Sequence, residues 1–82
     1  MKLHKNIAIS DTGFVFNPTT GDSFSVNPIG LQILRDLQKG ASESEIQINL
    51  QHNFQVDKET VEKDVYDFFK MIAQFNLLDF HE

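Results

Sequence analysis

Hydrophobic and polar residues alternate along the first third of the chain, which is the pattern of β-strands whose side chains point to opposite faces in turn. Three such segments are separated by two groups of turn residues. These groups are Asp-Thr-Gly at 11–13 and Asn-Pro-Thr-Thr-Gly-Asp at 17–22. We therefore predict a three-stranded antiparallel meander with one apolar face, and place Val15, Ser23 and Ser25 on the other face. The residues predicted to line the apolar face are Ile7, Ile9, Phe14, Phe16, Phe24 and Val26.

Apolar residues then recur at helical spacing in three further segments. Each segment begins at a residue that caps helices: Asn27 followed by Pro28, Ser42 in a capping box with Glu45, and Asp57. Three helices are therefore predicted to cover the apolar face of the sheet, followed by a short apolar tail. The apolar positions of the helices and the tail are Ile29, Ile33, Leu34 and Leu37; Ile46, Leu50 and Phe54; Val61, Val65, Phe68, Phe69, Ile72 and Phe75; and Leu77, Leu78 and Phe80.

The length of 82 residues and the 40% hydrophobic content suit one domain with a modest core, which we place at residues 1–82. The expected fold class is α+β, with the element order β-β-β-α-α-α. The chain has no cysteine, which excludes disulfides, thiolate metal sites and protein-ligated iron–sulfur clusters. No apolar run reaches signal-peptide or membrane-spanning length. We therefore expect a cytoplasmic protein that does not bind membranes.

Residue types that could support chemistry are scattered along the sequence. His4, His52 and His81 share no short motif, and no Gly-x-Ser-x-Gly elbow is present. Acidic pairs occur only in predicted helices with lysines nearby, where a solvated helix face is the simplest interpretation. These pairs are Glu43/Glu45, Glu59/Glu62 and Asp64/Asp67. We expect no catalytic site, no metal and no cofactor.

Single residues and short segments between Gly13 and Leu78 form an ordered set. They are Phe-Val-Phe-Asn at 14–17, Phe-Ser-Val-Asn at 24–27, Gly30, Ile33, Leu34, Leu37, Gly40, Ser42, Glu45, Ile46, Leu50, Phe54, Val61, Asp64, Val65, Phe68 and Asn-Leu-Leu at 76–78. In this ordered set the chain resembles the PqqD family of pyrroloquinoline quinone biosynthesis and the wider class of RiPP recognition elements, which serve ribosomally made, modified peptides.

The resemblance implies a three-stranded sheet packed on a winged-helix-like trio of helices. It implies a non-enzymatic function, which is to hold the leader segment of a precursor peptide and present it to a modifying enzyme, often a radical S-adenosylmethionine enzyme. The expected partners are thus the leader and that enzyme.

A peptide can be held by adding a strand to an exposed sheet edge. The candidate edge is the third strand, Ser23, Phe24, Ser25 and Val26, because its small serines do not obstruct an incoming backbone. The sequence does not reveal which amides face outward, and each apolar residue could instead belong to the core. The same open edge would allow a weak homodimer. The resemblance places the far wall of the groove on the third helix, here Val65, Tyr66, Phe69 and Ala73.

Two alternatives remain open beside this hypothesis. A winged-helix DNA-binding module has similar elements, but DNA affinity depends on clustered Lys and Arg. The net charge is −5, Arg35 is the single arginine, and acids outnumber lysines in the third helix, so nucleic acid is not an expected partner. The charged residues of that helix are Lys58, Lys63 and Lys70 against Glu59, Glu62, Asp64 and Asp67. The second alternative is a generic protein-interaction module.

Overall fold

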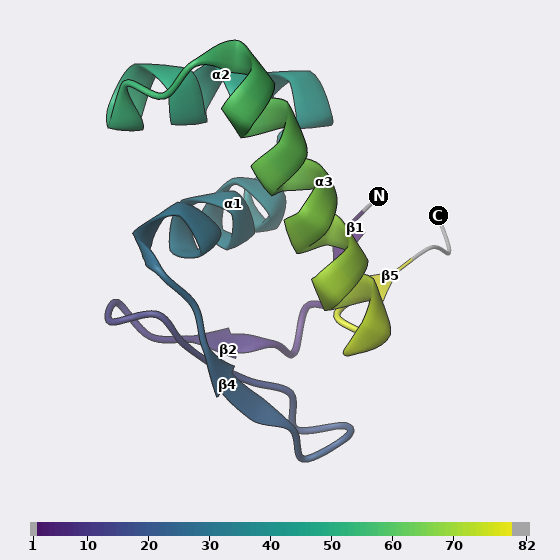
Figure 1. The fold of residues 1–82 in the computed structure, drawn as a ribbon. Helices are drawn as coiled ribbons and strands as arrows, with labels where there is room; N and C mark the ends of the chain where they lie inside the picture. The colour runs from purple at the N-terminus through teal and green to yellow at the C-terminus, as the bar shows by residue number, and fades with distance from the viewer. Residues whose placement is uncertain (1, 80–82) are drawn as a thin grey trace.

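A three-stranded antiparallel sheet and the three helices that follow it occur in the predicted order (Figure 1). The computed structural model describes residues 2–79. The strands of the sheet lie side by side in the order β2-β3-β4, and the predicted α+β fold class is confirmed. The elements are β2 (Ala8–Ile9), β3 (Phe14–Phe16), β4 (Ser23–Ser25), α1 (Pro28–Gln38), α2 (Glu43–Phe54) and α3 (Lys58–Gln74).

A second, two-stranded sheet was not predicted. It joins β1 (Lys2–Leu3) to β5 (Leu78–Asp79), with Leu3 opposite Leu78, at the right of Figure 1. Leu3, Leu77 and Leu78 are all buried, so the predicted apolar tail belongs to the core. Its last residue, Phe80, lies outside the described residues. Two-residue strands show no alternation in the sequence, which is why the pattern did not reveal them.

The helices begin where their capping residues predicted. The Asn27 side chain accepts a hydrogen bond from the Gly30 amide at 2.8 Å. The Asp57 side chain accepts one from the Thr60 amide at 3.3 Å. At α2 the Ser42 amide donates to Glu45 Oε1 at 2.9 Å, and the Glu45 amide donates to Ser42 Oγ at 3.2 Å. Hydrogen bonding to the Glu45 carboxylate by the Ser42 amide, and to a smaller extent by the Ser42 hydroxyl, holds the pKa of that carboxyl below its ordinary value.

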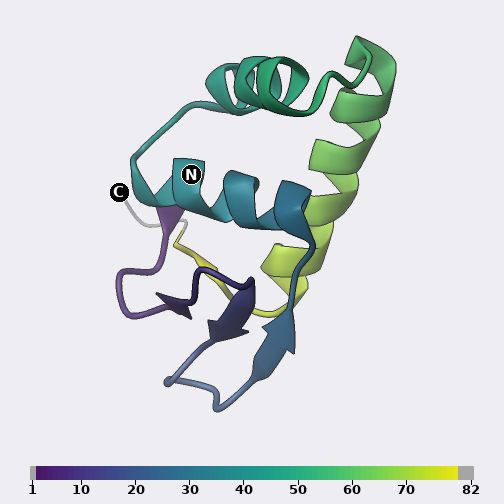
Figure 2. The same cartoon turned by 90° about the vertical axis from the view of Figure 1, so that its left-hand side faces the viewer.

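Helix α1 lies between α2 and the sheet, and α3 runs along one side of these layers (Figure 2). The apolar residues that meet between these layers form one continuous core. The buried apolar residues are Leu3, Ile7, Val15, Ile33, Leu34, Leu37, Ile46, Leu50, Val61, Val65, Ile72, Leu77 and Leu78.

The prediction for β3 was wrong in its choice of face. Val15 is fully buried, whereas Phe14 and Phe16 are 49% and 38% exposed. Val15 lies opposite Phe24 on β4, so these two side chains share the core face of the sheet. Alternation shows which residues share a face, but not which face turns inward. On the other strands the prediction was right, because Ile7 is buried and Ile9, Phe24 and Val26 pack against the core.

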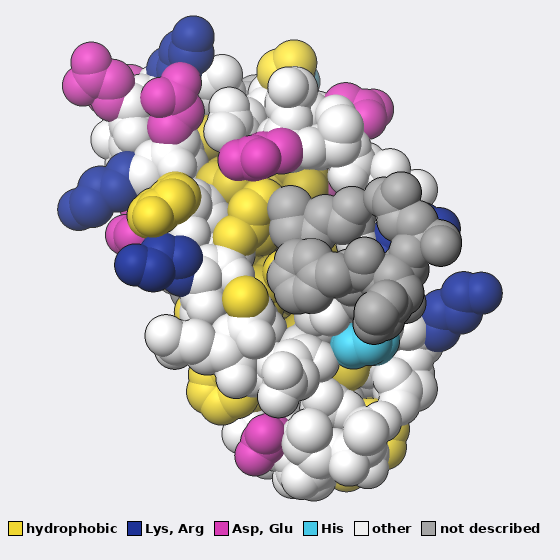
Figure 3. Space-filling view, turned by 90° about the vertical axis from the view of Figure 1, so that its right-hand side faces the viewer, with side chains coloured by type: hydrophobic (Ala, Val, Ile, Leu, Met, Phe, Trp, Pro, Cys, Tyr) yellow, Lys and Arg dark blue, Asp and Glu magenta, His cyan; other side chains and the backbone are white. Residues whose placement is uncertain are grey.

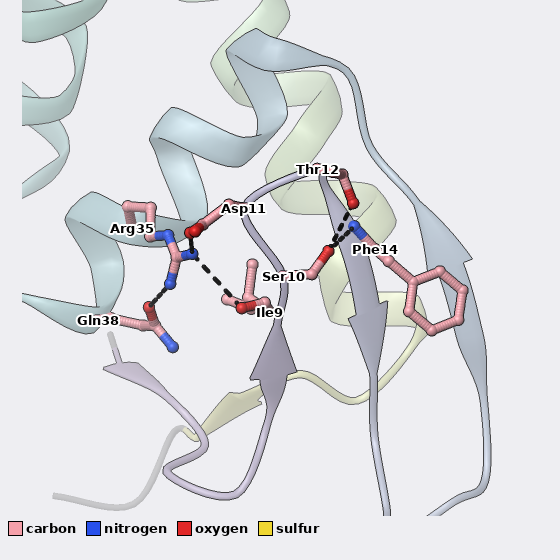
Figure 4. A network of polar contacts seen from close by, with 7 residues as sticks. All are labelled: Ile9, Ser10, Asp11, Thr12, Phe14, Arg35 and Gln38. Atoms are coloured by element: carbon pink, nitrogen blue, oxygen red, sulfur yellow. Dashed lines mark hydrogen bonds and ion pairs between the residues drawn. The ribbon is translucent and has the colours of Figure 1, made fainter.

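The turn between β2 and β3 is tied to α1 by Arg35 (Figure 4). Arg35 Nη2 donates to Asp11 Oδ1 at 2.8 Å and to the Ile9 carbonyl at 3.4 Å. Within the turn, Ser10 Oγ accepts a hydrogen bond from the Phe14 amide at 3.0 Å. These contacts connect the turn before β3 to α1.

Candidate functional site

Strand β4 is an outer strand of its sheet, with β3 as its neighbour. The Val26 amide donates to the Gly13 carbonyl at 2.8 Å, and the Asn17 amide donates to the Asp22 carbonyl at 2.9 Å. Hydrogen-bonded and non-hydrogen-bonded pairs alternate along an antiparallel ladder. Phe24 therefore bonds to β3 between these two points, and the N–H and C=O groups of Ser23 and Ser25 point away from β3. The open edge thus offers the backbones of the two serines.

The core side of β4 packs against α3. The rings of Phe24 and Phe75 are stacked, with centroids 4.7 Å apart and an interplanar angle of 25°. Closer to α1, the backbone at Gly30 approaches the Phe68 ring and the Val26 side chain so closely that an added Cβ would lie 2.8 Å and 3.0 Å from them. Aromatic contacts from α3 therefore fix the position of β4 behind its open edge.

A pocket of about 310 Å³ lies where β4 leads into α1, between the start of α1 and α3. Three of its six side chains are apolar and three are polar, and two of the polar ones are carboxylates from successive turns of α3. This end of the site is therefore suited to an apolar group with a neutral or basic end. The lining residues are Asn27, Ile29, Gly30, Ile33, Asp64, Asp67 and Phe68.

The four strand residues predicted for the site lie together on β4 and at its end. Ser23 and Ser25 are exposed, whereas Phe24 and Val26 are half-buried and pack against the core. Their arrangement answers the question that the sequence left open, since the backbones of the serines face outward. The apolar pair faces the helices.

The four residues predicted on α3 differ in their burial. Val65 is fully buried in the core, and Phe69 is half-buried against it. Tyr66 is 62% exposed, with Lys70 Nζ 5.5 Å from the centre of its ring, and Ala73 is exposed. None of the four lines the pocket.

The geometry of α3 explains this difference. Successive residues turn by about 100° around a helix, so Phe68 and Phe75 lie on one side of the buried Val65, and Tyr66, Phe69 and Ala73 lie on the other. The contacts of the aromatic pair show that their side faces β4. Phe68 and Phe75 are thus the aromatic side chains of α3 on the flank that faces β4.

Sequence reasoning had placed Phe68 and Phe75 in the core stripe. Which flank of α3 turns toward β4 depends on how the helix is placed, and apolar spacing does not specify this. One signal was present in the sequence. Gly30 lies inside a predicted helix, where glycine costs about 1 kcal/mol relative to alanine, and such a glycine often marks a close approach of another element.

The side of the molecule that carries α3, β1 and β5 shows charges of both signs (Figure 3). Acidic side chains lie between the Lys and Arg side chains, and apolar side chains gather at the centre of this view. Among residues 2–79, no group of three or more His, Asp or Glu side chains could hold a metal ion. Within the same part of the chain, the helices are too short or too polar to cross a membrane.

The fold and the site define an α+β domain with an open edge strand beside an aromatic helix flank. A family model described as coenzyme PQQ synthesis protein D (PqqD) matches residues 13–78. The protein therefore belongs to the PqqD family, and the resemblance seen in the sequence is confirmed.

Among solved structures, TbiB1 in complex with the TbiA(beta) leader peptide is similar to this chain. The two chains are 28% identical and superpose with a TM-score of 0.86, over 100% of this chain and 99% of the other. The search of curated proteins found no match.

Proposed function

We propose that the protein binds the leader segment of a ribosomally made precursor peptide in the cytoplasm and presents it to a separate modifying enzyme of the radical S-adenosylmethionine type. In this function the chain itself does no chemistry. Its membership of the PqqD family supports the proposal, as does its similarity to TbiB1, whose solved structure holds a leader peptide. The observation that carries the proposal is the open edge of β4.

The binding mode follows from the direction of the backbone groups. Ser23 and Ser25 each offer an N–H and a C=O to an added strand, and main-chain hydrogen bonds of this kind give affinity in strand addition. The peptide residue opposite Phe24 points its side chain to the same face as Phe24 does. That side chain lies next to Phe68, Phe75 and the pocket, so this residue and its neighbours two positions away are expected to be apolar.

The same edge would be used in a homodimer if two copies paired through β4. An exposed edge strand is a general template for such pairing. The leader peptide and a second copy of the protein would then compete for the backbone groups of Ser23 and Ser25. Leader binding should therefore convert any dimer to a monomer. Sedimentation of the protein with and without peptide would show this competition.

The variant Ser25→Pro tests strand addition, because it removes an N–H that the ladder to β3 does not use. One hydrogen bond contributes about 0.5–1.5 kcal/mol net, so leader affinity should fall about two- to tenfold, and further if the ring blocks the added strand. Stability should change little. Ser25→Thr is the matched control, since it keeps the amide and suits a strand.

Binding is measured by titrating ¹⁵N-labelled protein with a synthetic leader peptide from its cognate precursor. The amide signals of Ser23, Phe24, Ser25 and Val26 should shift. The proposed mode is wrong if saturating leader leaves these signals in place while another surface responds, or if Ser25→Pro binds as well as Ser25→Thr.

A further inference from the structure

The solvent-facing side of the sheet, which we call the outer sheet face, is apolar at its centre. The register places Phe14 opposite Ser25 and Phe16 opposite Ser23, so all four side chains share this face. Ala8, opposite Phe16 on β2, completes it. Both phenylalanines are among the large apolar side chains that the described residues leave exposed, at 49% and 38%. No member of the outer sheet face carries a charge.

The outer sheet face continues directly to the open edge. Ser23 and Ser25 are the outermost residues of the face, and the same residues turn their backbones to the edge. Their side chains are small, so little separates the phenylalanine rings from a strand added beside β4. In Figure 4 the Phe14 ring points away from α1 and Arg35. An added strand would therefore widen this face, with Phe14 and Phe16 in its middle.

The geometry of strand addition determines which side chains arrive there. Peptide residues that pair directly with Ser23 and Ser25 project to the outer sheet face, whereas the residue between them projects toward α3. Strands lie about 4.8 Å apart, so the added strand is roughly 10 Å from β3. A long side chain on the added strand can then reach across a serine of β4 and contact a phenylalanine ring of β3.

We propose that the outer sheet face is a second recognition surface, which selects large apolar side chains at the two alternate peptide positions that pair with Ser23 and Ser25. The proposal rests on the proposed function, since it needs a peptide strand on β4. The occupant is this peptide because the face is uncharged and continuous with the edge that holds it. Polar or charged peptide residues would leave Phe14 and Phe16 exposed and gain nothing there.

A display experiment tests the proposal without knowledge of the natural precursor. Yeast cells that display random dodecapeptides are sorted against the labelled full chain, in parallel for the wild type and for the double variant Phe14→Thr/Phe16→Thr. Threonine keeps the strand propensity of these positions. The matched control is Ile48→Thr, which removes an apolar side chain of 62% exposure from α2. Circular dichroism checks that each variant is folded.

We expect wild-type sorting to enrich peptides with apolar residues at two interleaved sets of alternate positions. In the double variant one set loses its preference while the set facing α3 keeps it, and Ile48→Thr changes neither. Alanine in the outward set should weaken binding to the wild type about tenfold, which is 1.4 kcal/mol, and to the double variant less than twofold. Intermolecular NOEs from the outward side chains to the Phe14 and Phe16 rings should appear in the wild-type complex, which requires no variant.

The inference is overturned, with leader binding intact, if the double variant selects the same peptides with the same affinity or if those NOEs are missing. It is also overturned if the double substitution dissociates a homodimer without changing peptide preference, because the face then belongs to a second copy. If the wild type enriches no extended peptide at all, both the inference and the proposed function are wrong.

Discussion

Gly30 offers a direct test of how closely α1, β4 and α3 approach one another. A Cβ at this position would lie 2.8 Å from a ring carbon of Phe68 and 3.0 Å from the Val26 Cβ. Both distances are shorter than ordinary van der Waals contact between carbon atoms, which is about 3.5–4.0 Å. The variant Gly30→Ala therefore forces the Phe68 ring or the start of α1 to move.

Two opposing effects set the size of the change. Alanine is favoured over glycine inside a helix by about 0.8–1.0 kcal/mol. Overpacking a well-packed site costs about 1–3 kcal/mol. The Phe68 ring is half-buried and can give way in part, but the Val26 Cβ is attached directly to the backbone. We expect the packing cost to win, so that Gly30→Ala destabilises the protein by about 0–2 kcal/mol relative to wild type.

Urea unfolding followed by circular dichroism measures this change, and a double-mutant cycle identifies its cause. Phe68→Leu removes the ring atoms nearest to Gly30, so Gly30→Ala should be less harmful, or even stabilising, in that background. A coupling of at least 0.5 kcal/mol is expected for residues in contact. The reasoning fails if Gly30→Ala stabilises the wild type by the full helix-propensity gain of about 1 kcal/mol, or if the two changes are additive.

Two further predictions concern polar groups outside the sheet. Asp36 is buried and accepts hydrogen bonds from Gln32 Nε2 at 2.9 Å and Asn49 Nδ2 at 3.3 Å. Asp36→Ala leaves these donors without an acceptor and should lower the free energy of unfolding in urea by about 1–3 kcal/mol. A decrease below about 0.5 kcal/mol would contradict this. The pKa of Glu45 is lowered in the folded state, so its bond to Ser42 stabilises the fold above the ordinary pKa of 4.5, and this contribution is lost as the pH falls through the lowered value. Glu45→Ala should therefore be less stable than wild type at neutral pH, and the difference should shrink as the pH falls below 4.5. A difference that does not change with pH would exclude the carboxylate as its source.

Local signals were enough to predict the three-stranded sheet, the three helices and their order. Capping residues and turn residues act on their near neighbours in the chain, so Asn27, Ser42 and Asp57 mark helix starts independently of the tertiary structure. The apolar alternation of β4 was also interpreted correctly. The open edge followed from the element order and from the small side chains of Ser23 and Ser25.

Features that depend on the placement of whole elements were not predictable in this way. The sequence around Phe14, Val15 and Phe16 is apolar on both faces of the strand, so the hydrophobic pattern does not choose between them. In the structure Val15 pairs with Phe24, whose ring stacks on Phe75 of α3, so Val15 lies on the face that packs against the helices. The flank of α3 that faces β4 was missed for the same reason, since a helix with apolar residues over a wide stripe can be rotated without changing its pattern.

The reversed face of β3 changes what the site can do. If Phe14 and Phe16 were core residues, as the alternation suggested, a peptide on β4 would be selected only by its side chains facing α3. With Val15 in the core instead, the sheet exposes two aromatic rings beside the serines that we propose hold the peptide backbone. At the same time the stack of Phe24 on Phe75 holds β4 in place before any peptide arrives. A strand that is already ordered loses less conformational freedom on binding, so even a short edge of three residues can hold a peptide when both of its faces contribute contacts.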